Sequence, residues 1–417
     1  MKKALVISAI ASNQGKTLLT MALLHHYKTN VRPFKCGPDF IDPQFHEKIA
    51  QTPSVNLDGY MMNSEQLTWV FEQYMDKEVA ILEGVMGYYD GMDKGASAYD
   101  VARTLNISSL LILDASGSYI TIAAVLKGMK EFRDDNTIQA VVLNKCSSQM
   151  HYDLVKKHLQ LEVPKVKVCG WIQKGLKTLS ATHLGLDLKE LDSQNIQEVT
   201  QDVLEHIDLD VLESIMGIEI KKVENYPFDP VIKKDETCVL LKDKNFSFVY
   251  HDNLEYLKEL YKKVILIDST KNEVIPEYAD IVIIPGGYVE TTQAHDRVKD
   301  SLAFRDSLIE HAKEKRVYAE CAGLIYLGKS CDDKEMSGIL PITFELTTKR
   351  ERLGYYKCEI DGELKKGHAF HYSRIKEAPQ TDIQLYKVSK KTAKDGGYKQ
   401  DKVFGTYLHT MWRLDGL

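Results

Sequence analysis

The sequence lacks any apolar run long enough to cross a membrane, and it has no C-x-x-C pair of cysteines. A spanning helix needs about 18 or more apolar residues, and the first residues, MKKALVIS, have too short an apolar part for a signal peptide. The seven cysteines are odd in number and scattered, which argues against a disulfide framework and against a zinc site. These absences predict a cytoplasmic protein that does not act at a membrane.

Excess positive charge is also absent, because the formal net charge is -6. A nucleic-acid partner is therefore not expected, although a local basic pocket for an anionic substrate is compatible with this balance. The 44% hydrophobic and 27% charged content is that of a globular protein. A chain of 417 residues exceeds one ordinary core, so two domains, or three, are expected.

The pattern along the chain predicts two α/β domains. Short apolar segments alternate with helical patterns in the first half, which favours a parallel sheet covered by helices on both faces. The expected strands of this half are 4–9, 31–36, 79–82, 109–114, 138–144 and 166–171. A Pro-containing, charged segment then interrupts the alternation, and a second series of strands follows at 238–250, 264–267, 281–284 and 317–319, with helices at 253–262 and 298–313 and further strands beyond Glu351. We expect domains at 1–216 and 237–417, joined by a linker at 217–236.

The first predicted strand is followed by ASNQGKT, residues 11–17, and then by a good helix. A strand, a loop ending in Gly15-Lys16-Thr17 and a helix form a cradle in which backbone N–H groups, including those near Ser12 and Asn13, face a phosphate. Lysine neutralises charge there, and threonine binds Mg²⁺. The loop is a variant one, because Ile10 stands where the usual first glycine would be.

Acidic residues end two strands of the same predicted sheet. Glu83 opens the stretch EGVMGYYDG, which contains Asp90, and Asp39 and Asp42 lie in KCGPDFIDP after the second strand. The carboxyl ends of parallel strands form the ligand-binding edge of such a sheet. Carboxylates at that edge, together with Thr17, predict a phosphoryl-transfer site that holds a metal ion.

A second site is predicted where AECAGLIYL passes from strand to helix at Cys321. A cysteine on such an elbow is exposed and lies at a helix N-terminus, which stabilises thiolate. N–H groups of Gly286 and Gly287 in IPGGY, together with that of Ala322, are candidates for an oxyanion hole. The base is left open among His409 and two competitors, His368 and His371.

The motifs KCGPDFIDPQFH, LDGYMM, EGVMGYYDG, FSFVYHDNLEYL, IPGGYVE, AECAGLIYL, GHAFHYS and YLH occur in one order along nearly the whole chain. In this combination the chain resembles the cobyrinic acid a,c-diamide synthase family, glutamine-dependent amidotransferases of corrin biosynthesis. The resemblance implies an N-terminal P-loop domain similar to dethiobiotin synthetase and a C-terminal glutaminase domain of the class I, triad type.

The resemblance also implies a carbon–nitrogen ligase that uses ATP, Mg²⁺ and L-glutamine. ATP phosphorylates a peripheral carboxylate of cobyrinic acid to an acyl phosphate, ammonia from glutamine displaces the phosphate, and the a and c acetates are amidated in turn. By the same resemblance, Asp39, Asp42, Glu83 and Asp90 match acidic positions that handle metal or substrate, and the sequence does not separate the two roles. We expect Thr17, Asp39 and Glu83 at the metal and Asp42 and Asp90 in the reaction. The nucleotide is expected to contact the loop residues Ser12, Asn13, Gly15, Lys16 and Thr17, with Asn144 reading adenine. Cys321 matches the nucleophile, His409 the base, and Gly286 and Gly287 the oxyanion loop.

Several positions depart from the family pattern, and some alternatives stay open. Asn13 replaces a common glycine, Ala369 a glutamate and Val289 a proline, and Met411 stands where ordinary triad glutaminases have a glutamate. Nickel-sirohydrochlorin and hydrogenobyrinic acid are alternative acceptors, and cobyric acid synthase shares both domains. A regulatory protein with a decayed glutaminase half is the alternative from another class. The protein is expected to be a monomer or a homodimer.

Overall fold

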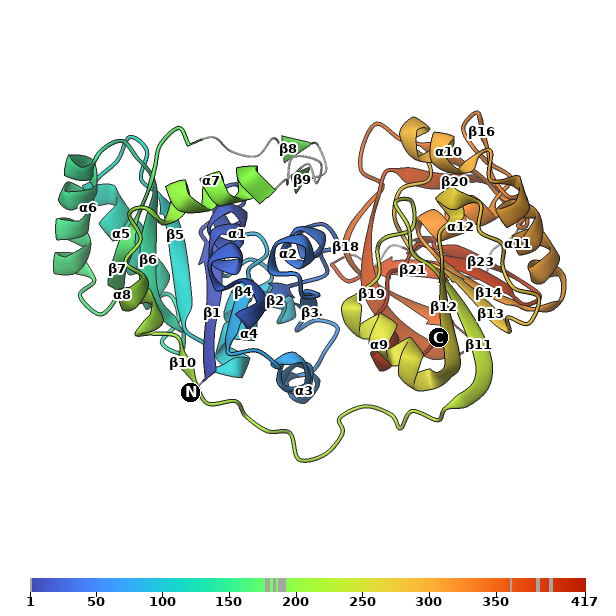
Figure 1. The fold of residues 1–417 in the computed structure, drawn as a ribbon, viewed down its shortest axis with the longest axis horizontal. Coiled ribbons are helices and arrows are strands. Elements are labelled where there is room, and N and C mark those ends of the chain that lie inside the picture. The colour runs from blue at the N-terminus through green and yellow to red at the C-terminus, as the bar shows by residue number, and fades with distance from the viewer. Residues whose placement is uncertain are drawn as a thin grey trace. The chain divides into compact units, whose positions relative to one another are not determined.

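The structure is a computed structural model that describes residues 2–176, 181–182, 185–186, 193–360, 362–379, 383–389 and 393–417. It divides into two compact units, Met1–Pro227 and Phe228–Leu417 (Figure 1). The boundary lies inside the segment expected to be a linker, whose two ends belong to the sheets of the two units. Among the described residues no helix is both long and apolar enough to span a bilayer.

The first unit is built on an eight-stranded sheet in the order β3-β2-β4-β1-β5-β6-β7, in which these strands are parallel and β10 pairs antiparallel with β1. Its strands are β1 Lys2–Ala9, β2 Val31–Cys36, β3 Val55–Leu57, β4 Val79–Glu83, β5 Ser109–Asp114, β6 Ile138–Cys146, β7 Lys167–Gln173, β8 Ala181–Thr182, β9 Gly185–Leu186 and β10 Gly217–Ile218. Its helices are α1 Lys16–Tyr27, α2 Asp42–Ala50, α3 Ser64–Tyr74, α4 Ala98–Leu105, α5 Ile120–Glu131, α6 Gln149–Glu162, α7 Ser193–Leu204 and α8 Leu209–Glu213, with 3-10 turns at Lys28–Asn30 and Met92–Lys94.

The alternation of side chains along β1 divides the core of this unit into two layers, one on each face of the sheet. Leu5, Ile7 and Ala9 point to one side, where they pack with buried residues of α1, α2 and α7, and α1 and α7 lie side by side over the sheet (Figure 1). Because side chains of a strand alternate between faces, the intervening residues face the opposite layer. Helices therefore cover the sheet while the carboxyl ends of β1, β2 and β4 stay together at one edge.

The second unit contains a six-stranded sheet in the order β12-β11-β13-β14-β24-β23, parallel except for β23, and additional smaller sheets. Its strands are β11 Lys234–Leu241, β12 Tyr261–Ile267, β13 Ile281–Ile284, β14 Arg316–Glu320, β15 Ser330–Cys331, β16 Lys334–Glu335, β17 Thr343–Leu346, β18 Arg352–Ile360, β19 Glu363–His371, β20 Ser373–Glu377, β21 Gln384–Lys387, β22 Ala393–Asp395, β23 Gly397–Gln400 and β24 Val403–Thr406. Its helices are α9 His251–Leu260, α10 Thr292–Val298, α11 Leu302–Glu314, α12 Ala322–Leu327 and α13 Trp412–Asp415, with a 3-10 turn at Ser269–Lys271.

The predicted α/β class of both halves is confirmed, and so are the six strands expected in the first half. The strand expected at 238–250 was too long, since β11 ends at Leu241. Asp243 explains the stop, because its carboxylate accepts the main-chain N–H groups of Asn245 at 2.7 Å and of Phe246 at 3.0 Å, which turns the chain. The helix expected at 298–313 is also corrected, because α10 ends at Val298 and α11 begins four residues later.

Candidate active site

The loop between β1 and α1 owes its shape to two residues with left-handed backbone, Asn13 at φ 61° and Gly15 at φ 101°. Asn is one of the few residues that tolerate this region, and glycine adopts it freely. Gly15 is also required sterically, because a Cβ there would lie 2.4 Å from Nδ2 of Asn144. Helix α1 then begins at Lys16, so its unpaired N–H groups face the loop.

Asn144, at the sheet edge on β6, supports this loop. Its Nδ2 donates to the Gln14 carbonyl at 2.9 Å, and its Oδ1 accepts the Lys145 main-chain N–H at 2.8 Å. Asn144 also borders a pocket of about 410 Å³ beside the loop. The residues that line this pocket are Asn13, Gly15, Thr17, Leu18, Met21, Asn144, Lys145, Ile172, Gln173, Gly175 and Leu176. Its place beside the loop suits a nucleoside, whereas adenine recognition by Asn144 stays a prediction.

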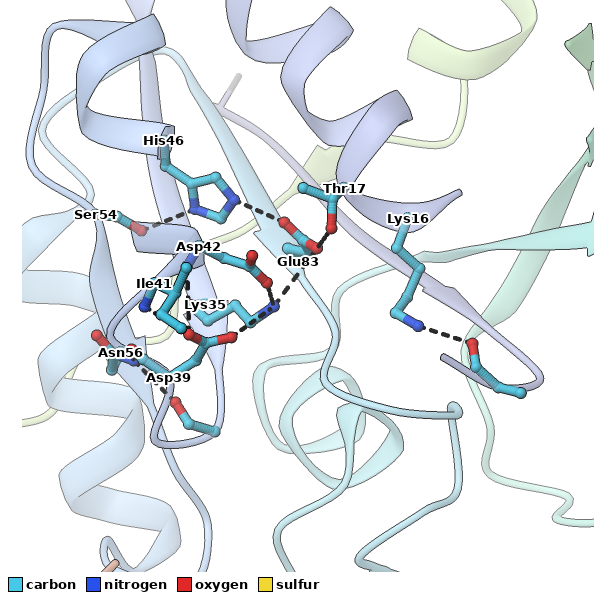
Figure 2. A network of polar contacts seen from close by, with 12 residues as sticks. Lys16, Thr17, Lys35, Asp39, Ile41, Asp42, His46, Ser54, Asn56 and Glu83 are labelled. Carbon is cyan, nitrogen blue, oxygen red and sulfur yellow. Dashed lines mark hydrogen bonds and ion pairs between the residues drawn. The ribbon is translucent and has the colours of Figure 1, made fainter. Parts of the chain in front are cut away.

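Thr17 and Glu83, which are far apart in the sequence, meet directly. Thr17 Oγ1 donates to Glu83 Oε1 at 2.6 Å (Figure 2). The other carboxylate oxygen lies 2.7 Å from Nε2 of His46, whose Nδ1 is 3.1 Å from Ser54 Oγ. The sequence reasoning missed His46, although it stands one helical turn after Asp42 on α2 and so shares its face.

Lys35 is the second residue that the sequence reasoning missed, and it lies at the centre of the acidic cluster (Figure 2). It pairs with Glu83 in the register of β2 and β4, which places the two side chains at the same sheet edge. Its Nζ lies 3.5 Å from Glu83 Oε1 and 3.5 Å from Asp39 Oδ2, and it contacts Asp42 Oδ2. Three carboxylates therefore share one buried ammonium.

These charges shift one another's pKa. Burial alone would raise the pKa of Glu83, but Lys35 and the hydrogen bonds from His46 and Thr17 outweigh it and lower the pKa to about 2. Burial raises the pKa of Asp42 to about 8 against the opposing effect of Lys35, and the neighbouring carboxylates of Glu83 and Asp39 add to the rise. The cluster therefore holds three carboxylates against one ammonium, and this excess of negative charge fits a divalent cation.

Among the described residues no three His, Cys, Asp or Glu side chains form a ready-made metal cage. Mg²⁺ does not require one, because it binds through one or two protein ligands, substrate phosphates and water. The Thr17 hydroxyl and the Glu83 carboxylate are groups of this kind, and their role as metal ligands stays a prediction. Asp39 is partly engaged, since its Oδ1 accepts the main-chain N–H groups of Ile41 at 2.7 Å and Asp42 at 3.3 Å.

Two further predicted residues lie apart from this carboxylate cluster. Lys16 donates to the Ala11 carbonyl at 2.9 Å, back into its own loop (Figure 2), and burial lowers its pKa. Asp90 accepts the main-chain N–H of Gly87 at 2.8 Å. A Cβ on Gly87 would lie 2.5 Å from the Ile10 carbonyl and 2.8 Å from Asp90 Oδ2, so the glycine allows this loop to pack against the end of β1.

In the second unit Cys321 stands on a strained elbow between β14 and α12, at φ 49° and ψ −103°. Its N–H donates to the Thr406 carbonyl at 2.7 Å. Gly323 allows the sharp turn, because a Cβ there would lie 2.1 Å from the Ile284 carbonyl. The sequence predicted a thiolate, but this environment favours the protonated thiol. Burial raises the pKa of the Cys321 thiol, and the negative charge of Glu290 raises it further. The thiol therefore needs a base.

Gly286 and His409 are in close contact, so the predicted oxyanion loop and the predicted base meet. A Cβ on Gly286 would lie 2.2 Å from Cε1 of His409. Gly287 has φ 155°, and a Cβ there would lie 1.9 Å from the Asn245 carbonyl. The close packing explains why both positions are glycine. The oxyanion role of Gly286, Gly287 and Ala322 stays a prediction.

The competitor His371 is committed to a buried structural network. Its Nδ1 donates to the Ser373 carbonyl at 2.7 Å, its Nε2 accepts from Arg352 Nη1 at 3.3 Å, and its ring stacks on Tyr407 at 3.9 Å. Burial, with Arg352 nearby, holds the pKa of His371 well below its usual value. His368 exchanges main-chain hydrogen bonds with His409 at 3.0 and 2.8 Å. The contacts of His371 thus argue against it as the base, and the role of His409 stays a prediction.

The chain is similar to known proteins over nearly its whole length. Residues 237–416 match the model of the CobB/CobQ-like glutamine amidotransferase domain. The cobyrinate a,c-diamide synthase of Fusobacterium nucleatum is 32% identical over 97% of this chain and 98% of that protein, and the one of Methanocaldococcus jannaschii is 31% identical over 98% of this chain and 95% of that protein. Among solved structures, the hydrogenase maturation factor HypB from Archaeoglobus fulgidus is 13% identical over 52% of this chain and 91% of that chain, with a TM-score of 0.30.

A parallel α/β unit with a Gly-Lys-Thr loop, together with a unit matching a glutamine amidotransferase, defines a glutamine-dependent ligase. Within that class, the chain belongs to the cobyrinate a,c-diamide synthase family.

Proposed function

We propose that this protein uses ATP and glutamine to amidate the a and c acetate carboxylates of cobyrinic acid, in cobalamin biosynthesis, through an acyl-phosphate intermediate. The observation that carries the proposal is the 2.6 Å hydrogen bond between Thr17 and Glu83, which joins the phosphate loop to the acidic edge of the sheet. Nucleotide and carboxylate substrate then meet at one place, as phosphoryl transfer requires.

In the first half-reaction a carboxylate oxygen of the acceptor attacks the γ-phosphorus of ATP and ADP leaves. The N-terminus of α1 and the loop N–H groups hold the phosphates, and Lys16 turns from the Ala11 carbonyl to the anion. Thr17 and Glu83 would hold Mg²⁺, which would supply positive charge for the phosphates. Asp42 and Asp90 are placed to orient the acceptor, and Lys35 holds the acidic residues in position.

In the second unit, Cys321 Sγ attacks the side-chain amide of glutamine while His409 accepts the thiol proton and passes it to the departing ammonia. Water then releases glutamate from the thioester. Ammonia attacks the carbonyl carbon of the acyl phosphate, a proton is lost, and phosphate leaves as the amide forms. The support for this division is the elbow at Cys321, the contact between Gly286 and His409, and the match of residues 237–416 to a glutamine amidotransferase domain.

The test is to incubate the purified protein with ATP, Mg²⁺ and glutamine, to offer cobyrinic acid, hydrogenobyrinic acid and nickel-sirohydrochlorin separately, and to count the amides on each by mass spectrometry. Two amides on cobyrinic acid are expected. Preference for another acceptor would reassign the substrate, and no amide on any acceptor, with ammonium salts failing as well, would refute the proposed reaction.

The Cys321→Ala variant tests the division of labour in the same assay. It should abolish glutamine-dependent amidation and leave amidation with ammonium salts intact, because the acceptor site lies in the first unit. Loss of both activities would instead give Cys321 a structural or substrate-binding role.

A further inference from the structure

His409 needs a group that orients its ring, because a neutral imidazole acts as a base only when the correct nitrogen is free. Met411, two residues after His409, is buried and apolar, so the carboxylate common at that spacing is missing. The orienting group must therefore come from another element.

Glu320 lies within ion-pair distance of the imidazole ring. Its Oε2 is 3.5 Å from His409 Nδ1, and both side chains are only 2% exposed. Glu320 is the last residue of β14 and immediately precedes Cys321. It pairs with Thr406 at the end of β24, and the chain from Thr406 leads directly to His409. One strand end thus carries both the nucleophile and the carboxylate that faces the base.

The second carboxylate oxygen fixes the orientation of the first. Glu320 Oε1 accepts hydrogen bonds from Tyr318 Oη at 2.9 Å, from Trp412 Nε1 at 2.9 Å, and from Oγ1 and N of Thr410 at 3.1 and 3.4 Å. An oxygen with so many donors cannot rotate away from them. Oε2 is left to face His409 Nδ1.

We propose that Glu320 is the positioning residue of the glutaminase site, which holds the proton of His409 on Nδ1 and leaves Nε2 to accept the proton of Cys321. The inference rests on the proposed glutaminase function. When the thiol proton reaches Nε2, the ring carries a positive charge whose Nδ1–H faces the Glu320 carboxylate, which stabilises it. That charge disappears when the same proton leaves with ammonia, so Glu320 itself neither gains nor loses a proton.

A purely structural role for Glu320 is the competing explanation, because its Oε1 joins three neighbouring side chains. Glu320→Gln separates the two roles. The amide oxygen still accepts from Tyr318, Trp412 and Thr410, whereas the NH₂ group donates to Nδ1 and favours the His409 tautomer that cannot accept the thiol proton.

In Glu320→Gln, kcat for glutamine hydrolysis should fall by about 100-fold to 10⁴-fold with KM for glutamine within about threefold of wild type. Labelling of Cys321 by an electrophilic glutamine analogue, followed by mass spectrometry, should slow to a similar extent. Amidation with ammonium salts should be unchanged, which also shows that the variant protein is folded.

Two further variants complete the test. Glu236→Gln makes the same change at a carboxylate that pairs with Arg316 at the start of β14, so kcat should stay within about threefold of wild type. Glu320→Asp keeps the charge on a shorter side chain and should lie between wild type and Glu320→Gln. The inference is overturned if Glu320→Gln hydrolyses glutamine as fast as wild type, if Glu236→Gln loses as much activity, or if Glu320→Asp is less active than Glu320→Gln. A wild-type protein that does not hydrolyse glutamine would instead refute the proposed function.

Discussion

The substitution Gly286→Ala should disable the glutaminase site although Cys321 and His409 themselves are unchanged. The added Cβ would lie 2.2 Å from His409 Cε1, whereas ordinary contact begins at 3.4 Å, so the ring would have to move by about 1.2 Å. The main chain of His409 is tied to His368 in both directions, and the side chain is 2% exposed, so the ring itself must rotate out of place. A misplacement of about 1 Å costs about 100-fold in rate, which corresponds to about 2.7 kcal/mol in the barrier.

The assay is steady-state release of glutamate from glutamine, run beside ammonium-dependent amidation. Gly286→Ala should lose about 100-fold in the first activity and nothing in the second. Gly128→Ala on α5 is the matched control, because its added Cβ meets no atom within 4 Å. A Gly286→Ala protein that hydrolyses glutamine within about threefold of wild type would show that this contact does not set the position of His409.

Three further outcomes are expected. Glu83→Gln removes the charge that faces Thr17, so ammonium-dependent amidation should fall by at least about 100-fold while glutamine hydrolysis persists; unchanged amidation would remove Glu83 from the metal site. Gly15→Ala places a Cβ 2.4 Å from Asn144 Nδ2 at a residue with φ 101°. Calorimetry should therefore show that ATP binding is lost, and a normal affinity for ATP would disprove the phosphate-loop assignment. Because burial raises the pKa of Cys321, the thiolate is the minor form at neutral pH. The rate of Cys321 alkylation in the absence of glutamine should therefore keep rising with pH through about pH 9. A rate that reaches a plateau near neutral pH would contradict the raised pKa.

The features that could be predicted from the sequence are those that depend on consecutive residues. The loop at Gly15 and the elbow at Cys321 each require a particular backbone over a few positions, and small residues beside an apolar strand are the signal of that backbone. Asp39, Asp42 and Glu83 could be placed near one another because the carboxyl ends of parallel strands share one edge. The boundaries of β11 and α11 were harder to predict from the sequence, because a single turn such as that at Asp243 is enough to end an element.

Contacts between distant residues were decided only by the tertiary structure. The amino-acid sequence alone does not show that His46 contacts Glu83 or that Lys35 has three carboxylate neighbours, because strand order and register determine those pairs.

The same is true of the histidines in the second unit. The sequence offered three candidate bases, and packing assigned His371 to a network with Arg352 while it brought His409 against Gly286 and Glu320. The sequence by itself therefore determined the chemical groups and the strand ends that carry them. The tertiary structure decided which groups share a buried environment, and hence which are charged, oriented and able to act.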